Sequence, residues 1–270
     1  MYAKLLAYEI RSRYRADARS FGAFIVTIAA ASGIVAAGLP GISGSTAVLA
    51  YALCALTPVA CAIAAMADYW KTLYGQRGYF TMSLPVSGTT IFWAKTTRMV
   101  IECLLALALA VGGIIAVASA AAWSDGISLA EYTAGPRSLV AGVPTSTVAI
   151  MIVVQVLVSL SWLVQGSAVM SIGAEGRFNH MGFGAPIIGF VLLYIVNQVL
   201  STVGTFFLPL SVTTDGHFST EIMWTSYLAT MGTEGQPNVI GIGSYVLVPL
   251  FALVMAICAS RSIEKHTSLR

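Results

Sequence analysis

The chain has 270 residues, of which 57% are hydrophobic and only 9% charged. Soluble domains carry roughly 25% charged residues, and a soluble fold of this size could not bury so much apolar surface. The composition therefore predicts a membrane protein. The net charge of +3 is too small to indicate a nucleic-acid partner.

Six apolar stretches are long enough to cross a bilayer as a helix, which takes about 20 residues. They lie at 21–39, 46–67, 99–122, 147–172, 181–200 and 239–259. Each is continuous and rich in Ala, Leu, Ile and Gly, as packed membrane helices are, whereas barrel strands alternate over about ten residues. We therefore expect an all-α membrane protein with six transmembrane helices, in which residues 1–270 form a single domain.

Residues 1–20 are predicted to form an amphipathic helix along the inner leaflet, before the first span. Apolar side chains recur at every fourth position, at Tyr2, Leu6, Ile10 and Tyr14. A separate basic row consists of Arg11, Arg15 and Arg19. The alternative is a basic anchor without an interfacial helix.

The fifth stretch stays apolar as far as Leu210, which is longer than a span requires. Asn197 and Gln198 interrupt it, and Gly204 and Pro209 follow. We expect the span to end near Leu200 and residues 201–210 to dip back into the outer leaflet, with a steeply tilted helix as the alternative.

The lysines and arginines are distributed unequally between the two sides of these spans. Of the 14, only Arg137 falls on the side opposite to the termini. Cytoplasmic segments carry the excess of Lys and Arg in membrane proteins. We therefore expect a multi-pass protein with both termini in the cytoplasm.

The cytoplasmic segment between the second and third spans, GYFTMSLPVSGTTIFWAKTTR, is unusually specific in sequence. Tyr79 and Phe80 lie too far from either span for a simple interfacial belt. Pro85 disfavours a helix through it and extends the residue before it, and Ser87 can cap a new helix. The pattern predicts a short helix, a turn and a second helix, which suits insertion into a groove of a soluble partner.

Motifs for enzymatic chemistry are missing from the sequence. It has no G-x-x-x-x-G-K-[ST] phosphate loop, no H-E-x-x-H and no G-x-S-x-G. The three histidines lie in different loops or tails, at His180, His217 and His266. We expect no catalytic residue, no metal and no cofactor bound by this chain.

The cytoplasmic segment resembles the corresponding segment of type-2 ATP-binding-cassette (ABC) exporter permeases. The likeness lies in Gly78–Thr81, Ser83–Ser87 and Ala94-Lys95, which are similar to a "GYLT…LPVS…K" pattern common in multidrug and antimicrobial-peptide transporters. Gly88 departs from the pattern, because relatives often carry a polar or basic residue there. The six spans and the basic first helix are also similar.

The resemblance implies a permease subunit in a bacterial plasma membrane that moves a hydrophobic or amphipathic substrate, such as a peptide or drug, outward. Its partners would be a second permease copy or paralogue and separate cytoplasmic ATPase subunits, which bind ATP and Mg²⁺. The coupling residues would be Arg77, Gly78, Tyr79, Phe80 and Thr81. The alternative is a membrane-integral accessory or sensor protein without transport activity.

Polar residues inside spans are costly and are therefore candidates for a substrate path. They are Glu102, Gln155, Gln165, Asn197 and Gln198. For Glu102 the alternative is an ion pair with Arg98, four residues earlier. For the amides it is hydrogen bonding between helices.

Overall fold

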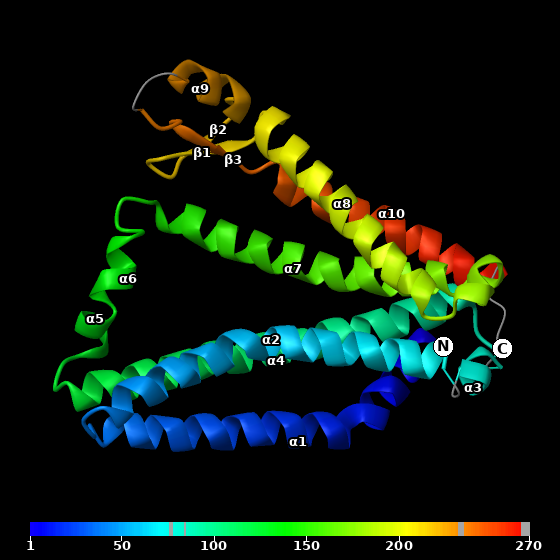
Figure 1. The fold of residues 1–270 in the computed structure, drawn as a ribbon, viewed down its shortest axis with the longest axis horizontal. Coiled ribbons are helices and arrows are strands. Elements are labelled where there is room, and N and C mark those ends of the chain that lie inside the picture. Colours follow the sequence, from blue (N-terminus) through cyan, green and yellow to red (C-terminus); the bar gives the residue numbers. More distant parts are fainter. Residues whose placement is uncertain (76–77, 84, 232–234, 266–270) are drawn as a thin grey trace. The chain divides into compact units, whose positions relative to one another are not determined.

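The computed structural model describes residues 1–75, 78–83, 85–231 and 235–265. Within these ranges, six helices are long and apolar enough to cross a membrane, which confirms the predicted number of spans. They are α1 (Tyr2–Ala36), α2 (Ile42–Leu73), α4 (Gly88–Ser124), α7 (Thr145–Gly173), α8 (Gly184–Phe207) and α10 (Ser244–Lys265) (Figure 1). The chain is therefore built as a multi-pass membrane protein.

Shorter elements connect these helices. They are α3 (Gly78–Met82), α5 (Leu129–Tyr132), α6 (Ala134–Ser138), the 3-10 helix η1 (Gly176–Met181) and α9 (Met223–Thr230). Between α8 and α10, β1 (Ser211–Thr213) pairs antiparallel with both β2 (Phe218–Ser219) and β3 (Val239–Gly241). This small sheet was not expected from the sequence, because its strands are only two or three residues long.

Each long helix extends beyond its predicted apolar stretch at one end at least, whereas α1, α8 and α10 fall short of it at the other end. Helix α10 begins at Ser244, because Val239–Gly241, the predicted start of the sixth span, forms β3. Helix α1 is continuous for 35 residues, so residues 1–20 and the first span belong to one helix. Helix α8 continues to Phe207, beyond the predicted end of the fifth span near Leu200, so residues 201–207 are helical. Near its end Gly204 lies so close to Ser244 that a Cβ there would be 2.5 Å from the Ser244 backbone nitrogen. Packing on the start of α10 thus supports the extra turns of α8.

The described chain divides into two compact units. Unit 1 comprises Met1–Gly75 and Trp93–Leu139, and its core lies where α1, α2 and α4 pack together. Buried core side chains come from all three helices and include Phe24, Ile28, Cys54 and Val117. Gly113 lies at the closest approach of α4 to its neighbours, since a Cβ there would be 2.7 Å from Cys54 Sγ.

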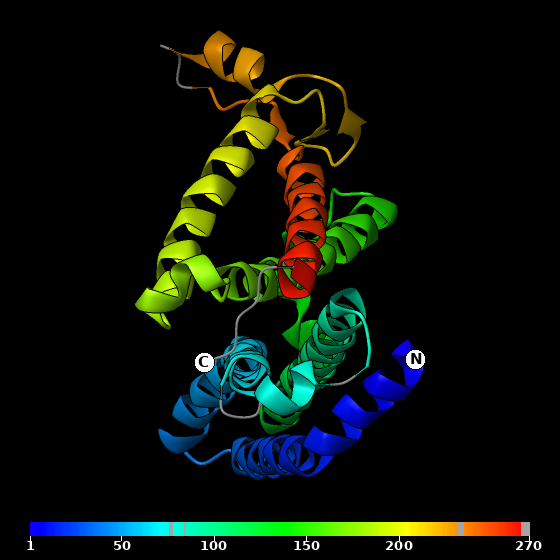
Figure 2. The same ribbon diagram turned by 90° about the vertical axis from the view of Figure 1, so that its right-hand side faces the viewer.

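Unit 2 comprises Gln76–Phe92 and Val140–Arg270. Helices α7, α8 and α10 pack against one another. Helices α8 and α10 lie close together near the sheet and diverge toward η1 (Figures 1 and 2). At the η1 end, Ser262 Oγ of α10 donates to the Ser171 carbonyl of α7 at 3.2 Å. The C-terminal ends of α7 and α10 therefore lie together.

Candidate functional site

The segment predicted to contact a partner contains a short helix followed by a second helix, as its sequence indicates. Tyr79 and Phe80 of α3 are 69% and 67% exposed. Arg77 and Leu84 lie outside the described residues. Ser87 precedes α4, and its hydroxyl accepts a hydrogen bond from the Thr90 backbone N–H at 3.3 Å, which confirms the predicted cap. Two aromatic side chains are thus presented outward beside a well-defined helix start.

The start of α4 is fixed to the C-terminal end of α10, within unit 2. Thr89 Oγ1 donates to Glu264 Oε1 at 2.9 Å. A Cβ at Gly88 would lie 2.8 Å from side-chain atoms of both Ile263 and Glu264. Gly88 is therefore buried in a helix contact, where a larger residue would collide.

Unit 1 holds a buried network of charges that joins α1, α2 and α4. Its cations are Arg13, Lys95 and Arg98, and its carboxylates are Glu9, Asp17, Asp68 and Glu102. The Lys95 and Arg98 side chains are each only 2% exposed. Opposite charges in contact offset the large cost of removing each ion from water.

The geometry of the network explains how it connects three helices. Lys95 Nζ of α4 lies 2.9 Å from Glu9 Oε1 of α1. The Asp68 carboxylate of α2 accepts from Arg13 at 2.9 Å and from Arg98 at 3.0 Å. The predicted Arg98–Glu102 pair is confirmed. The contacts from α1 and α2 were missed, because only the i, i+4 pair is visible within one helix.

Glu102 also lines an open cavity of about 410 Å³ in unit 1. Arg13 and Asp17 lie at the same cavity, whose remaining wall is mostly apolar and includes Phe24 and Leu53. Glu102 is therefore an ion-pair partner that also borders a cavity. Its place in a substrate path stays a prediction.

Gln165 and Asn197 form a buried polar link between α7, α8 and α10. Asn197 Nδ2 donates to Gln165 Oε1 at 2.6 Å, and Gln165 Nε2 donates to the Val248 carbonyl at 3.1 Å. Asn197 is 2% exposed and Gln165 is 0% exposed. This arrangement matches the interhelical hydrogen bonding that was the alternative to a substrate path.

The other two amides are placed differently. Gln155 accepts a hydrogen bond from the Tyr245 hydroxyl at 3.1 Å and lines a cavity of about 340 Å³ between α7, α8 and α10. Gln198 is exposed on α8. The structure thus brings Gln165 and Asn197 together, while Glu102, Gln155 and Gln198 lie at separate places.

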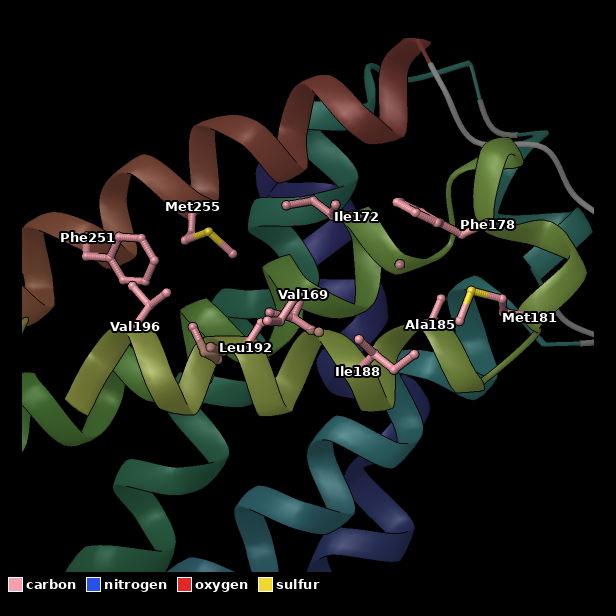
Figure 3. Close-up of a pocket in the computed structure, with 13 residues that line it drawn as sticks. Val169, Ile172, Phe178, Met181, Ala185, Ile188, Leu192, Val196, Phe251 and Met255 are labelled. Atoms are coloured by element: carbon pink, nitrogen blue, oxygen red, sulfur yellow. The ribbon is translucent and has the colours of Figure 1, made fainter. Parts of the chain in front are cut away.

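A further cavity of about 330 Å³ lies between α7, α8, α10 and η1 (Figure 3). Its lining side chains are all apolar, and Figure 3 shows Phe251 and Met255 of α10 facing Leu192 and Val196 of α8. Phe178 lines the cavity at its η1 end. This cavity could not be predicted from the sequence, because its lining residues have the same composition as other span residues.

Comparisons with known proteins add no family assignment. No family model, curated protein or solved structure matches the chain. Among the described residues, no group of three or more His, Cys, Asp or Glu side chains is placed to hold a metal ion.

Proposed function

We propose that the chain is the permease subunit of an ABC exporter, driven by separate cytoplasmic ATPase subunits. The observation that carries this proposal is the segment from α3 to the start of α4. It presents Tyr79 and Phe80 to solvent, and it is fastened to α10 through Thr89 and Glu264. Movement of a partner bound to the two aromatic residues would therefore be transmitted through Thr89 and Glu264 to α10, a helix long enough to span the membrane.

In this proposal ATP and Mg²⁺ bind only to the partner ATPase, and two permease chains rock between inward and outward states. The substrate is hydrophobic or amphipathic, such as a peptide or drug. Glu102 and Gln155 are the candidates for contact with it, because both line cavities. Gln165 and Asn197 instead hold helices together.

The experiment is co-purification of the tagged chain with its ATPase from the native membrane. Tyr79→Ala combined with Phe80→Ala removes both exposed aromatic side chains. Buried aromatic anchors at interfaces typically contribute about 2 kcal/mol or more, roughly thirty-fold in affinity. We expect the folded double variant to lose the ATPase.

Tyr14→Ala is the matched control, because Tyr14 is 68% exposed but lies on α1. This variant should retain the ATPase at the wild-type ratio. Full retention by the Tyr79, Phe80 double variant would contradict the proposed contact. If the wild-type chain captures no ATPase at all, an accessory or sensor role replaces the permease proposal.

A further inference from the structure

The apolar cavity of unit 2 has the length of one bilayer leaflet. On α8 its lining extends from Ala185 to Val196, and at 1.5 Å per residue this distance is about 17 Å. One leaflet contributes about half of a hydrocarbon core of about 30 Å. A molecule that fills the cavity along α8 would therefore reach from the η1 end to about the middle of the membrane.

The cavity is open on the side where α8 is exposed. Ile188 and Leu192 both line it, although their residues are 50% and 57% exposed. Purely apolar cavities do not hold ordered water, because a buried water needs polar partners. In a bilayer, the molecules that meet this opening are lipids, whose acyl chains match the lining in chemistry and length.

A cationic group stands at the η1 end of the cavity. The Arg177 guanidinium carbon lies 4.7 Å from the ring centroid of Phe178, a lining residue. Arg177 Nε pairs with Glu175 at 2.7 Å, and the Arg177 side chain remains 67% exposed. Its outer nitrogens are thus accessible, and arginine binds phosphate through two parallel hydrogen bonds.

Two further basic residues lie at this end of unit 2, together with the carboxylates of Glu175 and Glu264. Ser262 ties the end of α10 to the end of α7, so Arg261 and Lys265, both exposed, lie at the same end of unit 2. Basic clusters at a membrane surface attract anionic phospholipids. The apolar cavity and the Arg177 guanidinium beside Phe178 therefore select the same kind of molecule.

We propose that this cavity binds an anionic phospholipid, with one acyl chain along α8 and the phosphate at Arg177. The bound lipid supports the contact of α8 with α7 and α10 near η1. This role goes beyond export, and it holds whether or not an ATPase drives the chain.

The experiment measures lipid bound to the purified protein by native mass spectrometry, with phosphatidylglycerol or phosphatidylcholine added in increasing amounts. Ile188→Trp places an indole in the cavity. The indole should exclude two or more methylenes of the acyl chain from the cavity, which should weaken phosphatidylglycerol binding about tenfold. Ile187→Trp is the matched control, because Ile187 is 53% exposed on the same turn of α8 but does not line the cavity.

Arg177→Gln tests the head group. We expect the wild-type protein to prefer phosphatidylglycerol over phosphatidylcholine and the variant to lose that preference, while its binding of phosphatidylcholine is unchanged. Equal binding of the two lipids by the wild-type protein would overturn the phosphate contact. Equal phosphatidylglycerol binding by the Ile188→Trp and Ile187→Trp proteins would overturn the cavity.

A second measurement avoids any effect of substitution on folding. Phosphatidylglycerol with a photoreactive acyl chain is added to the wild-type protein in vesicles of phosphatidylcholine, and the labelled residues are identified. We expect labels concentrated on Ile188, Leu192, Phe251 and Met255. Labels spread equally over all exposed positions of α8 would show only the general lipid contact of a membrane helix.

Discussion

At the scale of residues, charge burial is the strongest feature of unit 1. Lys95 belongs to the part of the sequence that resembles ABC permeases, yet the structure buries its ammonium group against Glu9 and Thr72. Its role in this chain is therefore to join α4 to α1 and α2. Removing one partner of a buried pair leaves an uncompensated charge, which costs about 3–5 kcal/mol.

This cost predicts that Lys95→Met strongly lowers the thermal stability of the detergent-purified protein. Adding Glu9→Gln also removes the carboxylate that loses its ammonium partner in Lys95→Met. The double variant should therefore regain much of the lost thermal stability. Lys71→Met serves as the control, because Lys71 is exposed near the end of α2, and it should leave the unfolding temperature nearly unchanged. A double variant less stable than Lys95→Met alone would contradict the pairing.

At the scale of elements, glycine allows α4 to approach α1 and α2 closely. A Cβ at Gly113 would lie 2.7 Å from Cys54 Sγ and 3.3 Å from Phe24 Cζ, whereas one at Gly112 meets nothing within 4 Å. The two glycines are neighbours on one helix, so they differ in packing but not in depth or backbone geometry.

We therefore expect Gly113→Ala and Gly112→Ala to have opposite effects on stability. Overpacking at Gly113 should cost about 1–3 kcal/mol, whereas alanine at Gly112 should stabilise the helix by up to about 1 kcal/mol. Thermal unfolding of the two purified variants measures the difference. Equal changes in the unfolding temperature of the two variants would show that α1 and α2 do not restrict side-chain size on α4 at Gly113.

At the scale of the whole molecule, six helices long enough to cross a membrane and the uneven distribution of basic residues together predict which side each loop faces. The described basic residues of unit 2 lie at its η1 end, and Ser128 and Arg137 belong to the connection between α4 and α7, which is predicted to be external. The orientation itself remains a prediction.

Single cysteines in an otherwise cysteine-free chain test this orientation. Ser128→Cys should react with a membrane-impermeant thiol reagent in intact cells, because its loop is predicted to be external. Ser83→Cys should react only after the cells are permeabilised, although Ser83 is exposed. Reaction of Ser83→Cys from outside would reverse the orientation and remove the basis for a cytoplasmic partner.

The class of the molecule, the number of its long apolar helices and the helix start at Ser87 could be predicted from the amino-acid sequence alone. These features follow from local composition and from contacts within a few residues, such as the Arg98–Glu102 pair. The helix ends were predicted less well. The expected break near Leu200 rested on Asn197 and Gln198, but Asn197 is hydrogen-bonded within the packed helices and α8 continues to Phe207.

The contacts between residues far apart in the chain depend on helix packing and could not be predicted. Glu9 with Lys95, Asn197 with Gln165 and Thr89 with Glu264 are each far apart in the chain. Their meeting depends on helix packing, which no local pattern encodes. The apolar cavity beside Arg177 was hidden for a related reason: its lining has the same composition as any span, and only the way that three helices pack leaves space there.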